Sequence, residues 1–66
     1  MKKETAQRFL SKFVKVERLQ PADLRPFNLY GMLEDVDEDS IILRTKQGLG
    51  AIRLEDIISI SEAEHG

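Results

Sequence analysis

The sequence predicts a mainly β fold, in which an N-terminal helix is followed by five short strands that form a small, strongly bent barrel. Two observations support this prediction. Residues 27–60 contain three turn signals between short runs rich in β-branched residues. One glycine, Gly31, lies inside an otherwise apolar strand, and a glycine in a strand interior marks a sharp bend or a bulge. We therefore expect the sheet to curl at Gly31.

The N-terminal segment has the pattern of a short amphipathic helix. Its apolar residues recur at the i, i+3, i+4, i+7 spacing of one helix face, and they are Ala6, Phe9, Leu10 and Phe13. Thr5 can cap the first turn, and we expect a helix over residues 5–12. The opposite face of that helix would carry Arg8 and Lys12 one turn apart, joined at its end by Lys15.

Alternation with a period of two residues, together with turn residues, predicts five strands after the helix. We expect them over residues 13–19, 27–36, 40–45, 49–54 and 57–60, followed by a tail over residues 61–66. In the second strand, Leu29 should face the core, whereas Asn28 and Tyr30 should face outward. Pro21 and Pro26 bracket a loop of roughly seven residues, because a proline does not fit inside a sheet ladder.

The length of 66 residues predicts one domain, covering residues 1–66, with a small core. Domains of this size often gain stability from disulfides, metals or subunit contacts. The sequence has no cysteine and its one histidine, His65, is in the tail, which excludes a disulfide and a Cys/His zinc site. We therefore expect no metal and no cofactor, and self-association is the remaining support.

The acidic run over residues 35–39 is similar to the start of a calcium-binding loop. Such a loop needs glycine at its sixth position and glutamate at its twelfth, where this chain has Ser40 and Lys46. We expect a solubilising turn at a strand end instead. The chain also lacks cysteine and an evident base beside any serine or lysine, so we do not expect an enzyme.

Charge is distributed unevenly along the chain, although the formal net charge is only −2. Residues 1–30 hold seven Lys and Arg against three Asp and Glu, whereas residues 31–66 hold three against nine. A basic face is one feature of nucleic-acid-binding proteins, and ordinary solvated side chains are the alternative. No apolar run approaches the roughly 20 residues of a membrane span, so we expect a cytoplasmic protein with no membrane partner.

From Gly31 onward the chain resembles the Sm/LSm/Hfq superfamily. Gly31, Leu33 and Asp37 match the Gly-x-Leu and the following Asp of the first Sm motif. Residues 52–59, with the sequence IRLEDIIS, are similar to the second motif. This resemblance implies an SH3-like/Sm-like barrel, a homo-oligomeric ring, and RNA binding or RNA chaperone activity.

The resemblance also implies which residues would line the pore of a ring. Hfq-like rings bind uridine-rich RNA around the pore with an aromatic residue and a Lys-His pair. Here the aromatic position is Asp39, and the Lys-His pair falls on Leu54 and Glu55 when one extra residue is placed before it. Together with Asp37, these residues would line a pore with carboxylates, which repel phosphate. We therefore expect the pore site of that family to be absent.

Two other surfaces could bind RNA. The second strand around Asn28, Leu29 and Tyr30 resembles the region where Hfq-like rings bind adenine-rich RNA on the opposite face. Tyr30 could stack a base, a contact worth ~1–3 kcal/mol, and Asn28 could read a base edge. Tyr30 could instead cover the barrel or pack in a subunit contact. Basic side chains along the predicted helix could bind successive RNA phosphates, and they are Arg8, Lys12 and Lys15.

A second resemblance covers residues 8–33. Their sequence, RFLSKFVKVERLQPADLRPFNLYGML, is similar to the C-terminal domain of the ribosome maturation factor RimP, which has the same order of helix, V-x-V strand, proline-containing loop and Gly-marked strand. That domain shares the Sm-like barrel, so the expected fold is the same. It implies a different function, a protein-interaction module in ribosome assembly that binds a basic protein partner.

Overall fold

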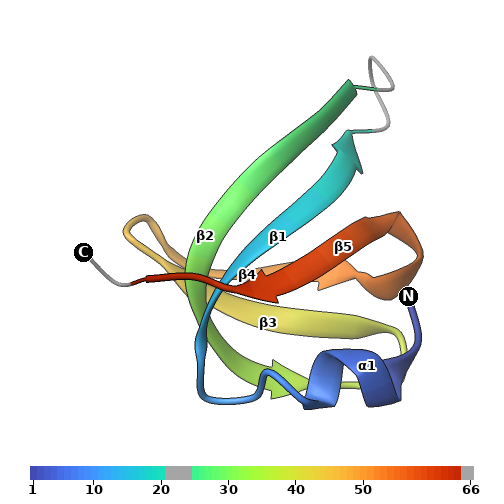
Figure 1. Ribbon diagram of the computed structural model, residues 1–66, viewed down its shortest axis with the longest axis horizontal. Helices are drawn as coiled ribbons and strands as arrows, with labels where there is room; N and C mark the ends of the chain where they lie inside the picture. The colour runs from blue at the N-terminus through green and yellow to red at the C-terminus, as the bar shows by residue number, and fades with distance from the viewer. Residues whose placement is uncertain (21–24, 65–66) are drawn as a thin grey trace.

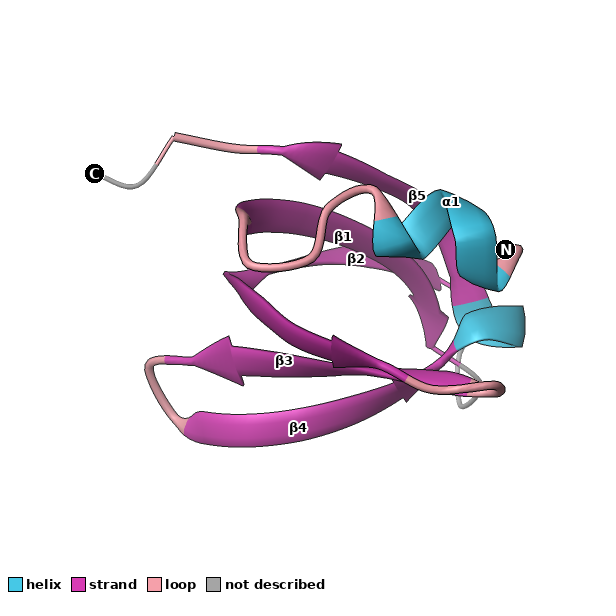
Figure 2. Ribbon diagram, turned by 90° about the horizontal axis from the view of Figure 1, so that it is seen from below, coloured by secondary structure: helices cyan, strands magenta, loops and turns pink. Residues whose placement is uncertain are grey.

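The computed structural model describes residues 1–20 and 25–64 of the chain. The elements in order are α1 (Lys3–Gln7), β1 (Phe13–Gln20), β2 (Arg25–Val36), β3 (Ser40–Thr45), β4 (Gly48–Arg53), a 3₁₀ turn (Leu54–Asp56) and β5 (Ile57–Glu62). The strands pair in the order β4-β3-β2-β1-β5, and each pairing is antiparallel. This confirms the predicted mainly β fold. The sheet curls into a barrel-like shape (Figure 1), and it is not closed between β4 and β5, which lie on opposite sides of the barrel in Figure 2.

The sheet curls where β2 passes from one partner to the other. Residues 25–32 of β2 pair with β1, and β3 begins to pair at Met32. A Cβ atom at Gly31 would lie 2.4 Å from the carbonyl oxygen of Arg44 on β3. Real Cβ atoms essentially never come so close to another atom. The bend predicted at Gly31 therefore requires a residue without a Cβ atom, which only glycine provides. A bulge between Leu33 and Asp35 adds to the curvature.

The apolar core lies on the inner face of the curled sheet. Every strand contributes to it, and its buried residues are Ala6, Val14, Val16, Leu33, Val36, Ile41, Leu43, Ile52, Leu54 and Ile57. Helix α1 lies at one end of the barrel beside the 3₁₀ turn (Figure 2). Ala6 on α1 is fully buried, and Phe9 packs against the same core. The helix therefore covers one end of the core.

The helix predicted over residues 5–12 is wrong in its bounds. Helix α1 begins at Lys3, so Thr5 lies inside it and Lys2 is the N-cap. The helix ends at Gln7 because the following segment bonds to β2 instead. The Ser11 N–H donates to the Leu33 carbonyl at 2.8 Å, and the Leu33 N–H donates to the Lys12 carbonyl at 3.0 Å. Ser11 has φ of 68°, which ends any helical continuation.

The proline-containing loop is shorter than predicted. Pro26 lies within β2, opposite Leu19, and β2 already begins at Arg25. Strand β3 pairs with β2 only from Met32 onward, so the first residues of β2 have no partner strand on that side among the described residues. Such a sheet edge tolerates Pro26, which has no backbone N–H. Pro21 lies outside the described residues.

Two other predicted bounds differ from the structure. Leu54 belongs to the 3₁₀ turn and not to the fourth strand, which ends at Arg53. The tail predicted over residues 61–66 is partly strand, because β5 continues to Glu62 and pairs there with Val14. Residues 65–66, including His65, lie outside the described residues.

Candidate nucleic-acid interface

Strands β1 and β2 bring an exposed aromatic ring next to a lysine. Lys15 on β1 stands directly opposite Tyr30 on β2, and side chains at opposed positions project from the same face. Tyr30 is 52% exposed, so about half of the residue is open to solvent. Because Val14 and Val16 point into the core, Lys15 between them is on the outer face. Tyr30 and Lys15 therefore occupy neighbouring positions on the outside of the barrel.

The adjacent row of the same face is polar. Glu17 on β1 stands opposite Asn28 on β2 and opposite Ser59 on β5. The Ser59 hydroxyl donates a hydrogen bond of 3.3 Å to the Glu17 carboxylate. The Glu17 carboxylate is therefore bound to Ser59. Asn28 is exposed, and it lies two residues before Tyr30 on the same face of β2. The outer face thus has an aromatic ring, a cation and an amide within two neighbouring rows, which we call the Tyr30 face (Lys15, Glu17, Asn28 and Tyr30).

Leu29 does not belong to the Tyr30 face. It stands opposite the fully buried Val16 and packs against the core. Adjacent residues of a strand point to opposite faces, so Leu29 does not share a surface with Asn28 and Tyr30, and RNA binding by Leu29 stays a prediction.

The three predicted phosphate-binding bases do not form one helical face. Arg8 follows the end of α1 and is exposed. The Lys12 Nζ atom lies 3.7 Å from a carboxylate oxygen of Glu62, whose partner on β1 is the inward-facing Val14. Only Lys15 lies on the Tyr30 face. The shortened helix explains the difference, because the one-turn spacing that would align these bases needs helix over residues 8–12.

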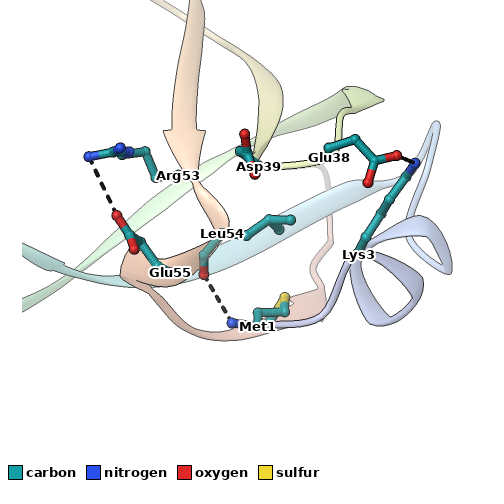
Figure 3. A pocket seen from close by; sticks show the side chains of 7 residues that line it. All are labelled: Met1, Lys3, Glu38, Asp39, Arg53, Leu54 and Glu55. Atoms are coloured by element: carbon teal, nitrogen blue, oxygen red, sulfur yellow. Dashed lines mark hydrogen bonds and ion pairs between the residues drawn. The ribbon is translucent and has the colours of Figure 1, made fainter.

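The predicted pore-lining residues meet at one end of the barrel. Asp39, Leu54 and Glu55 line a pocket of about 460 Å³, and its other lining residues are Met1, Lys3, Glu38 and Arg53 (Figure 3). The Leu54 N–H donates to the Asp39 carbonyl at 2.8 Å, which ties the β2–β3 turn to the 3₁₀ turn. Asp37 lies in the same β2–β3 turn, where its N–H donates to the Ser40 carbonyl at 2.8 Å. The Leu54 side chain itself is 5% exposed and belongs to the core.

Bases that the sequence analysis missed neutralise part of this pocket. The Lys3 ammonium lies 2.7 Å from Glu38, and the Arg53 guanidinium lies 3.4 Å from Glu55. The hydrogen bond and charge of Lys3 lower the pKa of the Glu38 carboxyl, and Glu38 raises the pKa of Lys3 in the same way. The Met1 ammonium donates to the Leu54 carbonyl at 3.0 Å. The Lys3–Glu38 and Met1–Leu54 contacts could not be found from a local sequence pattern, because their partners are 35 and 53 residues apart in the chain.

The part of the chain that the structure describes has neither a candidate metal site nor a membrane-spanning helix. Residues 1–20 and 25–64 contain no group of three or more His, Cys, Asp or Glu placed to hold a metal ion. Within the same residues, no helix has the length and apolar character needed to cross a membrane.

Comparison with known proteins gives no match to this chain, whether with family models, with curated proteins or with solved structures. The Sm-like and RimP-like resemblances therefore stay hypotheses based on the residues quoted above.

Proposed function

We propose that this protein is an Sm-like RNA-binding protein that acts in the cytoplasm as a homo-oligomeric ring. The Tyr30 face carries this proposal. A base can stack on the exposed Tyr30 ring, since every nucleobase has a π-face, and the stacked nucleotide's phosphate can pair with the Lys15 ammonium. Asn28 can then donate to or accept from the edge of a neighbouring base.

The open edges of the sheet support self-association. Strands β4 and β5 are the two ends of the strand order, so each has one edge without a partner strand among the described residues. Pairing β4 of one copy with β5 of the next would satisfy both edges. Such a head-to-tail contact forms a ring when the rotation closes, and a ring would repeat the Tyr30 face in every subunit. Repeated sites on one RNA strand raise affinity without any new contact.

The acidic end of the barrel would direct RNA to the outer face. In a ring whose pore is lined by Asp37, Asp39 and Glu55, the carboxylates would repel phosphates there. The Tyr30 face has one acid, Glu17, which Ser59 holds by a hydrogen bond. We therefore expect adenine-rich RNA on the Tyr30 face and no binding of uridine-rich RNA in the pore.

Fluorescence anisotropy with labelled A-rich and U-rich oligonucleotides tests this function. Tyr30→Ala should weaken A-rich RNA binding by about 5- to 150-fold, the equivalent of ~1–3 kcal/mol of stacking. Tyr30→Phe keeps the ring and should bind within a few-fold of the wild type. Lys15→Ala should reduce the slope of log affinity against log salt by about 1. Equal affinity of Tyr30→Ala and the wild type would contradict the proposal.

A second candidate function is binding of a basic protein segment, as the RimP-like resemblance suggests. The pocket with Glu38, Asp39 and Glu55 favours it. Lys3 pairs with Glu38 and Arg53 pairs with Glu55, which leaves the Asp39 carboxylate without an ion pair among the described residues. This function predicts no RNA binding in the anisotropy experiment. It also predicts that a Lys- and Arg-rich peptide binds and that Asp39→Asn weakens the binding of that peptide.

A further inference from the structure

Strands β1 and β2 extend beyond β5 as a two-stranded arm. The pairing of β1 with β5 stops at Arg18, while the pairing of β1 with β2 continues to Gln20 and Arg25 (Figure 1). Arg18 and Phe27 stand opposite each other on the inner face of this arm. The Arg18 guanidinium carbon lies 5.3 Å from the centroid of the Phe27 ring. This cation–π contact holds the guanidinium group in place.

A cleft of about 250 Å³ lies between the arm and β4, and we call it the arm cleft. Its apolar lining includes Leu29, Leu43 and Ile52. Arg18 is the one charged residue among the described residues that line it. The Arg18 Nε atom is buried and has no hydrogen-bond partner within residues 1–20 and 25–64. A buried donor without an acceptor is costly, so the arm cleft is suited to a carboxylate brought in by an apolar segment.

Strand β5 of a second copy is an apolar segment that carries a carboxylate. It has isoleucines along its length, with Ile58 53% exposed, and it ends at Glu62. The Glu62 side chain is 63% exposed, and its contact with Lys12 in the same chain is long, at 3.7 Å. The carboxylate can therefore turn to another partner.

The equal lengths of the two edge strands, β4 and β5, suggest a simple register for their pairing between copies. Strands β4 and β5 each have six residues, so full antiparallel pairing between copies places Glu62 opposite Gly48 and Ile60 opposite Gly50. A Cβ atom at either glycine would meet nothing within 4 Å, so this part of β4 has open space for the side chains of an added strand. In their own chain, Ile60 and Glu62 stand opposite Val16 and Val14, which places them on the inner face. Gly50 stands opposite the buried Leu43, so the inner faces of the two strands coincide at Gly50 and Gly48 in this register; the bulge in β5 before Ser59 ends this agreement toward Ile57.

We propose that Arg18 in the arm cleft binds the Glu62 carboxylate of a second copy whose β5 adds to β4. The proposal rests on the proposed self-association and deepens it. Arg18 makes the contact selective, because a strand without an acid at this position would leave the buried Nε atom without an acceptor. The partner copy completes the site by supplying the acceptor.

A charge swap tests this pairing by sedimentation velocity over a range of protein concentrations. Arg18→Glu and Glu62→Arg should each raise the concentration needed for half-maximal assembly by about tenfold or more, because each places like charges at the contact. The double variant Arg18→Glu/Glu62→Arg should return to within about threefold of the wild type, since coupled residues are not additive.

Two control variants isolate the contact. Arg8→Glu makes the same change of charge outside the arm cleft and should assemble like the wild type. Lys12→Ala removes the contact of Glu62 within its own chain and should also leave assembly unchanged. Far-UV circular dichroism checks that each variant is folded. A wild type that stays monomeric would overturn the proposed self-association as well. A wild type that assembles, with Arg18→Glu unaffected or with no rescue in the double variant, would overturn the Arg18–Glu62 pairing alone.

Discussion

Gly31→Ala should lower the free energy of unfolding by about 3 kcal/mol, because overpacking against a backbone group cannot be relieved by a side-chain rotation. The added Cβ would lie 2.4 Å from the Arg44 carbonyl oxygen and 3.0 Å from the Arg44 carbonyl carbon. Either β2 or β3 must move, and both carry core residues close to this point, Leu33 on β2 and Leu43 on β3. A domain of this size has a total stability on the order of 3–10 kcal/mol, so the loss is roughly a third of it or more. Urea denaturation at matched protein concentration measures the change.

Gly50→Ala is the matched control for this prediction. It makes the same chemical change in a strand, but its Cβ would meet nothing within 4 Å. At a protein concentration where the chain is monomeric, its free energy of unfolding should stay within about 0.5 kcal/mol of the wild type, the usual range for an exposed substitution. If Gly31→Ala is as stable as Gly50→Ala, the close approach of β2 and β3 at Gly31 is not a feature of the folded protein.

Leu33→Ala should destabilise the protein by about 2–5 kcal/mol, because it leaves a cavity in the centre of the core. Leu33 is fully buried, and its main chain also bonds to the segment after α1 through Ser11 and Lys12. A small core has few other contacts with which to compensate. The measurement is again urea denaturation at matched concentration.

Leu49→Ala is the control for Leu33→Ala. It removes the same atoms from a side chain that is 61% exposed, so its effect should be below about 0.5 kcal/mol. Equal effects of the two substitutions would mean that Leu33 is not in the core.

The strands could be predicted from the sequence because their signals are local. Alternating apolar residues and turn residues define β3 over residues 40–45, where the predicted and observed bounds coincide. The bend at Gly31 was also predictable, since a glycine inside a strand usually marks a bend or a bulge. The end of α1 was not predictable, because it depends on hydrogen bonds from residues 11–12 to Leu33. The strand position of Pro26 likewise depends on where β3 stops pairing.

The candidate site was predictable only in part. The alternation of the sequence alone predicts that Asn28 and Tyr30 share one face. The neighbour of Tyr30 across the sheet, Lys15, could be identified only from the register of β1 and β2. Arg18 gave no signal in the sequence, because its role depends on the packing of the arm against β4.

Native mass spectrometry of the purified protein with short A-rich and U-rich oligonucleotides tests the central claim most directly, because it counts subunits and bound RNA together. The proposed function predicts a closed oligomer that retains A-rich RNA, and a Tyr30→Ala oligomer of the same size that does not. A monomer that binds neither oligonucleotide would contradict it.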